Sequence, residues 1–333
     1  MSIPPNPSRL ISMATSYWES ATLMAAVRLR LFDALTSPKT AEEVAKTLGS
    51  DPIATEALLI ALISLDLIQR QDDCYLNQPT TQTFLTSQSP QSIAAALLYN
   101  ADVYPLWGQL HTVIEKGDTQ KDPQAYLGDD EGRTRRFVYG MHHRALGVGR
   151  AVGQIINFEG STLLADLGGG PGTYSALLTQ KTPGLKAHVL DLEGVVNVSR
   201  DIMIEMNASE NVQCLAYDYY KDELPDFPYD AALISGVLHR EQPAQVQKIF
   251  QHLAQRLPQG GRLWISDVML NDERTGPVFS AMFALNMRVL AHDGRCHSVA
   301  EQTQWLHNAG FEVCSTHQLD APIHYTLIEA RRL

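Results

Sequence analysis

The chain has 333 residues, of which 44% are hydrophobic, and this favours a globular protein of two domains or of one large domain with an extension. A net charge of −11 and the lack of a Lys/Arg cluster argue against nucleic acid as a partner. The N-terminus shows no signal peptide, and no apolar stretch is long enough to span a bilayer. The four cysteines are scattered and form no CxxC pair, which argues against disulfides and a metal site. We therefore expect a cytoplasmic protein without a membrane partner.

The first predicted helix covers residues 17–35. Its apolar side chains recur at helical spacing, at Leu23, Ala26, Val27 and Leu31. This stripe exceeds what a lone N-terminal helix needs, so we expect it to join two copies of the chain in a homodimer.

Two shorter helices and a hairpin follow. Thr40 and Glu43 form a capping box at the start of one helix, and Pro52 occupies the first position of the next, which runs to about residue 66. Residues 67–76 alternate as a small hairpin. This order of helix, turn, helix and two-stranded wing is typical of a winged helix.

A winged helix either binds DNA or serves as a packing and dimerisation module. The second of its helices, residues 53–64, has no Lys or Arg with which to reach phosphates or guanine edges. We therefore favour packing and dimerisation, and keep transcription regulation as a remote alternative.

Longer helices are expected over residues 93–115 and 133–156. They are rich in aromatic residues: Tyr99, Tyr104, Trp107, Phe137 and Tyr139. We divide the chain into a winged-helix-like dimerisation domain over residues 1–100, a helical linker over residues 101–157 and a further domain over residues 158–333.

Strands and helices alternate from residue 163 onward. The predicted strands are residues 163–167, 187–190, 213–216, 231–235, 262–267, 312–316 and 325–330. This alternation predicts the α/β class, with a doubly wound, largely parallel sheet of seven strands. The last two strands have no helix between them, so we expect them to pair antiparallel.

Residues 166–172, Asp-Leu-Gly-Gly-Gly-Pro-Gly, join the first of these strands to a helix. Gly168 and Gly170 leave the backbone open to a ligand because they have no Cβ, and the helix start directs N–H groups at it. A dinucleotide fingerprint would have a small residue where this chain has Thr173. The spacing, with Asp166 at the strand end, resembles motif I of class I S-adenosylmethionine (SAM) methyltransferases, and the acid suits a ligand with an ammonium group.

Three more strand ends carry polar side chains on the ligand side of such a sheet. Asp191 ends the second strand, where a carboxylate can accept both ribose hydroxyls. Asp218 and Tyr219 follow the third strand, where the acid can bind the adenine amino group and the ring can stack on the base. Ser235 ends the fourth strand. Each alone is common turn chemistry, but their succession predicts SAM as the cofactor.

The chain as a whole resembles the plant-type O-methyltransferase family, whose bacterial relatives include hydroxyneurosporene and acetylserotonin methyltransferases. Leu238-His239 matches the start of the family's Leu-His-Asp-Trp segment, residues 258–263 match its Pro-x-Gly-Gly-Arg-Leu turn, and residues 309–311 match its late Ala-Gly-Phe. The resemblance covers nearly the whole chain. It implies a class I methyltransferase sheet behind an N-terminal dimerisation domain, a homodimer, and a small-molecule methyl acceptor.

The resemblance also implies that His239 is the general base that takes the proton of a hydroxyl acceptor. The plain structural alternative is a histidine that packs at the start of a helix. Because His239 lies just past the fourth strand, on the ligand side, we favour the active site.

Two departures from the family surround this histidine. Arg240 and Glu241 replace the family's Asp and Trp, and Cys296 stands where the family has a Glu that orients the base. A base without its carboxylate partner is poorly oriented. Asp267, at the end of the fifth strand, or His297 could support it instead.

The helix that leads into the sheet lies where the family builds its substrate chamber. Our candidate acceptor-binding residues are Trp107, Tyr139, Met141, His143, Arg144 and Arg288. Tyr139 and His143 share one helix face, and Met141 and Arg144 share another. Arg144, joined by Arg288, could clamp an acceptor carboxylate, or this segment could be a solvated helix face, and the sequence leaves both open.

We favour O-methylation of a small hydroxylated metabolite, with or without a carboxylate. The alternative is S-methylation of a small thioether acid, as in the methylthiohydroxybutyrate methyltransferases of dimethylsulfoniopropionate synthesis. A thioether has no proton to lose, so the altered positions at Arg240 and Cys296 would not matter for it. A winged-helix transcription regulator with a SAM fold is the remote third possibility.

Overall fold

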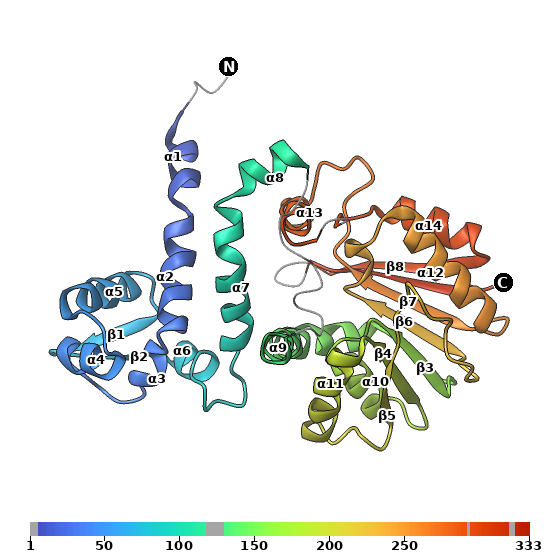
Figure 1. Cartoon of the computed structure of the whole chain (residues 1–333), viewed down its shortest axis with the longest axis horizontal. Helices are drawn as coiled ribbons and strands as arrows, with labels where there is room; N and C mark the ends of the chain where they lie inside the picture. Colours follow the sequence, from blue (N-terminus) through green and yellow to red (C-terminus); the bar gives the residue numbers. More distant parts are fainter. Residues whose placement is uncertain (1–5, 118–129, 292–293, 320–323) are drawn as a thin grey trace. The chain divides into compact units, whose positions relative to one another are not determined.

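The computed structural model describes residues 6–117, 130–291, 294–319 and 324–333, and the structural statements below concern these residues. The chain divides into two compact units, an N-terminal unit, Met1–Pro105, and a C-terminal unit, Leu106–Leu333 (Figure 1).

The N-terminal unit is mostly helical. Its elements are α1 (Ser8–Thr15), α2 (Tyr17–Arg28), α3 (Leu31–Ala34), α4 (Ala41–Leu48), α5 (Pro52–Ser64), β1 (Ile68–Gln71), β2 (Cys74–Asn77), α6 (Pro79–Phe84) and most of α7 (Ala94–Trp107). The predicted capping box of α4 is confirmed, because Thr40 and Glu43 each bond the other's backbone N–H. β1 and β2 form the expected antiparallel hairpin.

The helix predicted over residues 17–35 is in fact two helices. Arg30 adopts a left-handed backbone conformation with φ of 57°, which ends α2 and starts α3. A residue with a Cβ rarely adopts this conformation, so the residue type gave no sign of the break.

The stripe that we expected to form a dimer interface lies inside the N-terminal unit instead. Ala26, Val27 and Leu31 are 0%, 5% and 0% exposed and belong to the core of this unit. Exposed apolar side chains lie earlier in the chain, at Leu10, Ile11, Met13, Tyr17 and Trp18, and also later, for example at Ile53 and Ile60.

Among the described residues, no single helix is both long and apolar enough to cross a membrane. The pair α4 and α5 reaches that length and hydropathy only when taken together, with a bend of 113° between them.

The C-terminal unit is built on a seven-stranded sheet. Its strands are β3 (Leu163–Leu167), β4 (Lys186–Asp191), β5 (Val212–Ala216), β6 (Ala231–Ser235), β7 (Arg262–Asp267), β8 (Phe311–Gln318) and β9 (Thr326–Arg332). They are arranged in the order β5-β4-β3-β6-β7-β9-β8, with β3 to β7 parallel and β9 antiparallel to both β7 and β8. The predicted strands and the antiparallel ending are therefore confirmed.

Helices cover both faces of this sheet (Figure 1). The covering helices are α9 (Glu131–Ile155), α10 (Thr173–Lys181), α11 (Glu193–Glu205), α12 (Pro243–Arg256) and α14 (Val299–Asn308). The unit also contains α8 (Leu110–Lys116), α13 (Val278–Leu290) and a short 3-10 turn η2 (Leu238–Arg240). Side chains of α9, α10 and α11 form one apolar core with the sheet, and those of α12 and α14 form another. The carboxyl ends of the five parallel strands meet at one edge, where ligands of doubly wound sheets bind.

Candidate active site

The turn after β3 has a backbone that favours glycine. Gly168, Gly170 and Gly172 have φ values of 61°, 52° and 73°. A Cβ on Gly168 would lie 2.6 Å from Cγ2 of Val237, so a side chain would not fit there without movement. A Cβ on Gly170, in contrast, would meet its nearest atom only at 4.0 Å, so the turn is open at Gly170, shortly before the start of α10, which suits a polar ligand.

Thr173, the departure from a dinucleotide fingerprint, joins two helices. Its Oγ1 lies 2.8 Å from Nδ1 of His142 on α9. His142 is buried, and burial lowers its pKa to about 4, so the ring is neutral at physiological pH. This hydrogen bond connects the start of α10 to the helix that carries the candidate acceptor-binding residues.

Asp166 is buried at the end of β3. Its Oδ2 accepts a hydrogen bond from the Ser175 hydroxyl at 2.7 Å, whereas its Oδ1 has no partner within the described part of the chain. Burial raises the pKa of this carboxyl to about 7. A buried carboxylate oxygen without a partner is costly, and the ammonium group of SAM would satisfy it, so the residues present fit this cofactor.

Asp191 ends β4, beside the glycine turn. Its Oδ2 accepts from the Gly170 N–H at 2.8 Å and its Oδ1 from the Leu192 N–H at 2.7 Å. Burial raises the pKa of Asp191, and these hydrogen bonds and the Arg240 guanidinium oppose that shift. A carboxylate has about four acceptor positions, so capacity remains for two ribose hydroxyls.

The loop after β5 holds Asp218 and Tyr219. Asp218 accepts from the Tyr220 N–H at 3.0 Å and pairs with Lys221 at 2.8 Å. The Tyr219 hydroxyl donates to Oε1 of Glu241 at 2.7 Å. Both residues are therefore at the expected edge, and both are held by neighbours of their own chain.

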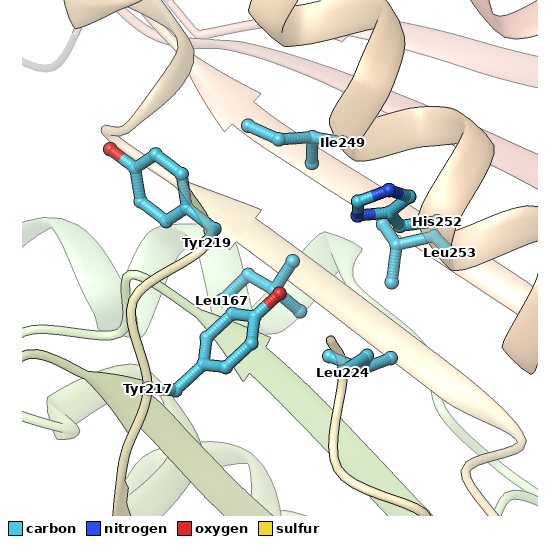
Figure 2. A pocket seen from close by; sticks show the side chains of 7 residues that line it. All are labelled: Leu167, Tyr217, Tyr219, Leu224, Ile249, His252 and Leu253. Atoms are coloured by element: carbon cyan, nitrogen blue, oxygen red, sulfur yellow. The ribbon is translucent and has the colours of Figure 1, made fainter. Parts of the chain in front are cut away.

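A narrow gap lies beneath this loop (Figure 2). It is lined by Leu167, Tyr217, Tyr219, Leu224, Ile249, His252 and Leu253. The gap is too narrow for a water-sized sphere, so it is a packing defect and not a ligand cavity. In Figure 2 the Tyr219 ring borders the gap while its hydroxyl points away from it.

His239 lies in η2, directly after β6, and Asp267 ends β7. The two side chains meet, with Nδ1 of His239 at 2.6 Å from Oδ1 of Asp267, and Oδ2 also accepts from the His239 N–H at 3.2 Å. Asp267 is 1% exposed and its Oδ1 accepts from the Val268 N–H as well. An ionised carboxylate only accepts hydrogen bonds, so Nδ1 carries the proton and the lone pair lies on Nε2.

Cys296, which replaces the family's Glu, and His297, the other predicted support of His239, have different surroundings. Cys296 is buried, and burial, with the nearby charge of Asp267, raises the pKa of its thiol. His297 points its Nε2 at the backbone carbonyls of Leu238 and Glu241, at 3.1 and 3.0 Å. His297 therefore braces the turn that carries the base, and Asp267 makes the contact with the base itself.

Arg144 lies near the strand ends. Burial raises the pKa of Tyr174, and a hydrogen bond with Ser235 and the Arg144 guanidinium oppose this shift. Burial also raises the pKa of Tyr325, again opposed by Arg144. The exposed guanidinium is thus in electrostatic reach of two tyrosines, one of which is bonded to the end of β6.

Three other candidate acceptor-binding residues are held by partners elsewhere in the unit. The Tyr139 hydroxyl donates to Oε1 of Glu205 at 2.6 Å, the Arg288 guanidinium to the Gly117 carbonyl at 2.7 Å, and the Trp107 indole N–H to Oδ1 of Asn286 at 2.8 Å. Met141 and His143 are half-buried on α9. Arg288 thus donates a hydrogen bond at the end of α8, and its pairing with Arg144 stays a prediction.

Aromatic rings lie next to the base, a feature that the sequence did not reveal. The Phe283 ring meets His239 edge-on at 4.9 Å, and Phe279 stacks on Phe283 at 6.0 Å and on His324 at 4.5 Å between ring centroids. Phenylalanines at this spacing are ordinary for an amphipathic helix, so only their position against His239 singles them out. Within the described ranges, no group of three or more His, Cys, Asp or Glu side chains could hold a metal ion.

Comparisons with known proteins agree with this geometry. The family model of the O-methyltransferase domain matches residues 117–312, and that of the O-methyltransferase dimerisation domain matches residues 11–87. The chain is 28% identical to 3-hydroxy-5-methyl-1-naphthoate 3-O-methyltransferase of Streptomyces sahachiroi, over 95% of this chain and 92% of that one. It is also 28% identical to the N,N-dimethyltransferase OxyT of Streptomyces rimosus, over 93% and 92%.

The fold has close counterparts among solved structures. Human N-acetylserotonin methyltransferase in complex with SAM superimposes with a TM-score of 0.87 at 24% identity, over 100% of this chain and 99% of that one. The chain belongs to the O-methyltransferase family and is a SAM-dependent methyltransferase.

Proposed function

We propose that the chain methylates a hydroxyl group of a small aromatic acceptor, with His239 as the general base. The observation that carries this proposal is the 2.6 Å contact between Nδ1 of His239 and the buried carboxylate of Asp267. Asp267 fixes the orientation of the ring and leaves Nε2 to take the proton of the hydroxyl. SAM, when bound, supplies an electrophilic methyl group on a cationic sulfonium.

We assign cofactor binding to the strand ends. Asp166 would pair with the ammonium group, Gly168 and Gly170 would line its approach, and Asp191 would accept the ribose hydroxyls. Asp218 and Tyr219 would contact the adenine. Ser235, which is hydrogen-bonded to Tyr174, would form the part of the site at the end of β6. The strongest support for this arrangement is Oδ1 of Asp166, which is buried without a hydrogen-bond partner among the described residues.

The aromatic rings of α13 support a flat acceptor. Phe279 and Phe283 are nearly parallel, at 12°, and Phe283 contacts the base. Aromatic rings bind other rings by stacking or by edge contacts worth about 0.5–1.5 kcal/mol beyond the area they bury. Such a wall holds a ring while its hydroxyl points at Nε2 of His239.

Arg144 is the candidate partner for a carboxylate on the acceptor. Its guanidinium is exposed and influences Tyr174 and Tyr325 beside the site. The relative from Streptomyces sahachiroi is named for a hydroxynaphthoate, which has both an aromatic hydroxyl and a carboxylate. We carry the same acceptor chemistry over to this chain, with Arg144 as the partner of the carboxylate.

The main argument for S-methylation of a thioether acid does not hold. That alternative rested on a base without a carboxylate partner, and Asp267 supplies such a partner from β7. The named relatives are an O- and an N-methyltransferase, which gives the thioether reaction no support.

A panel of acceptors tests the proposal. It should include naphthols, the matching hydroxynaphthoates, aromatic amines and thioether acids, each assayed for methyl transfer from SAM. We expect turnover with aromatic hydroxyls and a lower KM for those with a carboxylate. Arg144→Ala should raise the KM of the hydroxynaphthoate by about tenfold or more, the effect of losing a charge-assisted pair, and leave the KM of the naphthol unchanged. Turnover of thioether acids alone would refute O-methylation.

A further inference from the structure

Glu241 is a buried acid at the junction of two segments that border the proposed cofactor site. It is 3% exposed and directly follows η2. Its Oε1 accepts the Tyr219 hydroxyl at 2.7 Å, and its Oε2 accepts the Tyr220 hydroxyl. Its backbone carbonyl accepts from His297 at 3.0 Å, so the acid is fixed at its main chain as well.

Tyr219 and Tyr220 lie on the loop after β5. Their rings are 5.0 Å apart and tilted by 34°, so both hydroxyls reach the same carboxylate. The Arg240 guanidinium acts electrostatically on Tyr219 and on Asp191. Glu241 therefore joins the loop that follows β5 to the turn that contains His239.

The chemistry of this contact makes it strong. A buried carboxylate must be matched by donors, because an unmatched charge in the protein interior is costly. The two phenol groups donate to both of its oxygens, and hydrogen bonds to a charged group are about twice as strong as neutral ones. The family's Trp at this position has no acceptor with which to make such a contact.

We propose that Glu241 is a positioning residue that holds Tyr219 and Tyr220 in place and so fixes the adenosine side of the cofactor site relative to His239. This inference rests on the proposed cofactor site. It assigns Glu241 to cofactor affinity and not to proton transfer, because its carboxylate faces the tyrosines while Asp267 holds the base.

S-adenosylhomocysteine (SAH) binding to the full-length protein, measured by calorimetry, tests this. We expect Glu241→Ala to weaken SAH binding by about tenfold or more, because the loop loses its anchor. The double variant Tyr219→Phe/Tyr220→Phe removes only the hydroxyls and should weaken binding to a similar degree. Combining it with Glu241→Ala should add little, because the same contact is lost in each case.

The control is a second Tyr–Glu pair among the described residues of this unit. Glu205 accepts from Tyr139 at 2.6 Å at the end of α11, and Glu205→Gln should leave SAH affinity unchanged. In turnover assays the Glu241 variants should raise the KM for SAM by about the same factor as the SAH Kd, with a smaller change in kcat and the wild-type pH profile.

The outcomes separate this inference from the proposed function. Wild-type protein that does not bind SAH would refute the cofactor site itself. Wild-type protein that binds SAH, with equal affinity in the Tyr219→Phe/Tyr220→Phe variant, would overturn the role of Glu241 alone. That variant also decides the matter if Glu241→Ala does not fold. Additive losses in the combined variant, or an equal loss in Glu205→Gln, would likewise overturn it.

Discussion

Asp166 is a buried carboxyl, and burial raises its pKa to about 7. Its Oδ1 has no hydrogen-bond partner in the described part of the chain. The ammonium group of the cofactor favours the ionised form, so a protonated Asp166 must release its proton on binding. We therefore expect SAH affinity to fall as the pH drops below about 7. Calorimetry in buffers of different ionisation enthalpy should show proton release at pH 6.

Asp166→Asn is the control for this titration. It should bind SAH more weakly and with little dependence on pH between 6 and 8. Because the folded-state pKa lies above the ordinary value of 3.8, the proton stabilises the unliganded fold, and this contribution is lost as the pH rises through about 7. An SAH affinity that does not change with pH would contradict the pairing of Asp166 with the ammonium group.

Some of these residue positions can be predicted from the sequence, and some side-chain contacts cannot. Asp166, Asp191 and His239 stand at strand ends, so the sheet topology placed them correctly at one edge. The link from Glu241 to Tyr219 joins residues far apart in sequence through side-chain directions. No periodicity encodes such a contact, and it emerges only once the chain is folded.

At the scale of elements, α4 offers a measure of local stability. Thr40 accepts from the Glu43 N–H, and Glu43 in turn accepts from the Thr40 N–H at 2.8 Å. Thr40→Ala should lower the free energy of unfolding of the N-terminal unit by about 1 kcal/mol, the usual effect of losing an N-cap. Urea denaturation followed by circular dichroism measures this, with Thr83→Ala, which lies inside α6 and not at its N-cap, as the control. Equal stability of Thr40→Ala and wild type would contradict it.

Strands were predictable as elements because each is a short apolar run between turn residues. The positions at which the helices break were not predictable in this way. Arg30 ends α2 in a left-handed conformation, and the helix predicted over residues 93–115 is divided into α7 and α8 after Trp107. A residue with a Cβ, such as Arg30, rarely adopts the left-handed conformation, so its type does not signal the first break. The second break lies at Gly108, and a single glycine is also tolerated inside helices.

At the scale of the whole molecule, the N-terminal unit matches the family's dimerisation domain. Its exposed apolar side chains on α1 and α2 include Ile11 at 63% and Trp18 at 60%. Burying such side chains is what drives association, so we expect a homodimer formed through these two helices.

Light scattering tests this prediction. The double substitution Ile11→Asp/Trp18→Ser should convert the dimer to a monomer at micromolar concentration. The control Ile204→Asp changes an equally exposed apolar side chain, 66%, in the C-terminal unit and should leave the dimer intact. A monomeric wild-type protein, or a double variant that stays dimeric, would refute this interface.

We expect His239, oriented by Asp267, to remove the proton of a hydroxyl acceptor. The most direct measurement is kcat for an aromatic hydroxyl acceptor at saturating SAM, in wild type and in the His239→Ala and Asp267→Asn variants. We predict that His239→Ala lowers kcat by about 10²–10⁴-fold, the usual worth of a general base, and that Asp267→Asn causes a large loss as well. A His239→Ala variant with nearly wild-type kcat would contradict this role of His239.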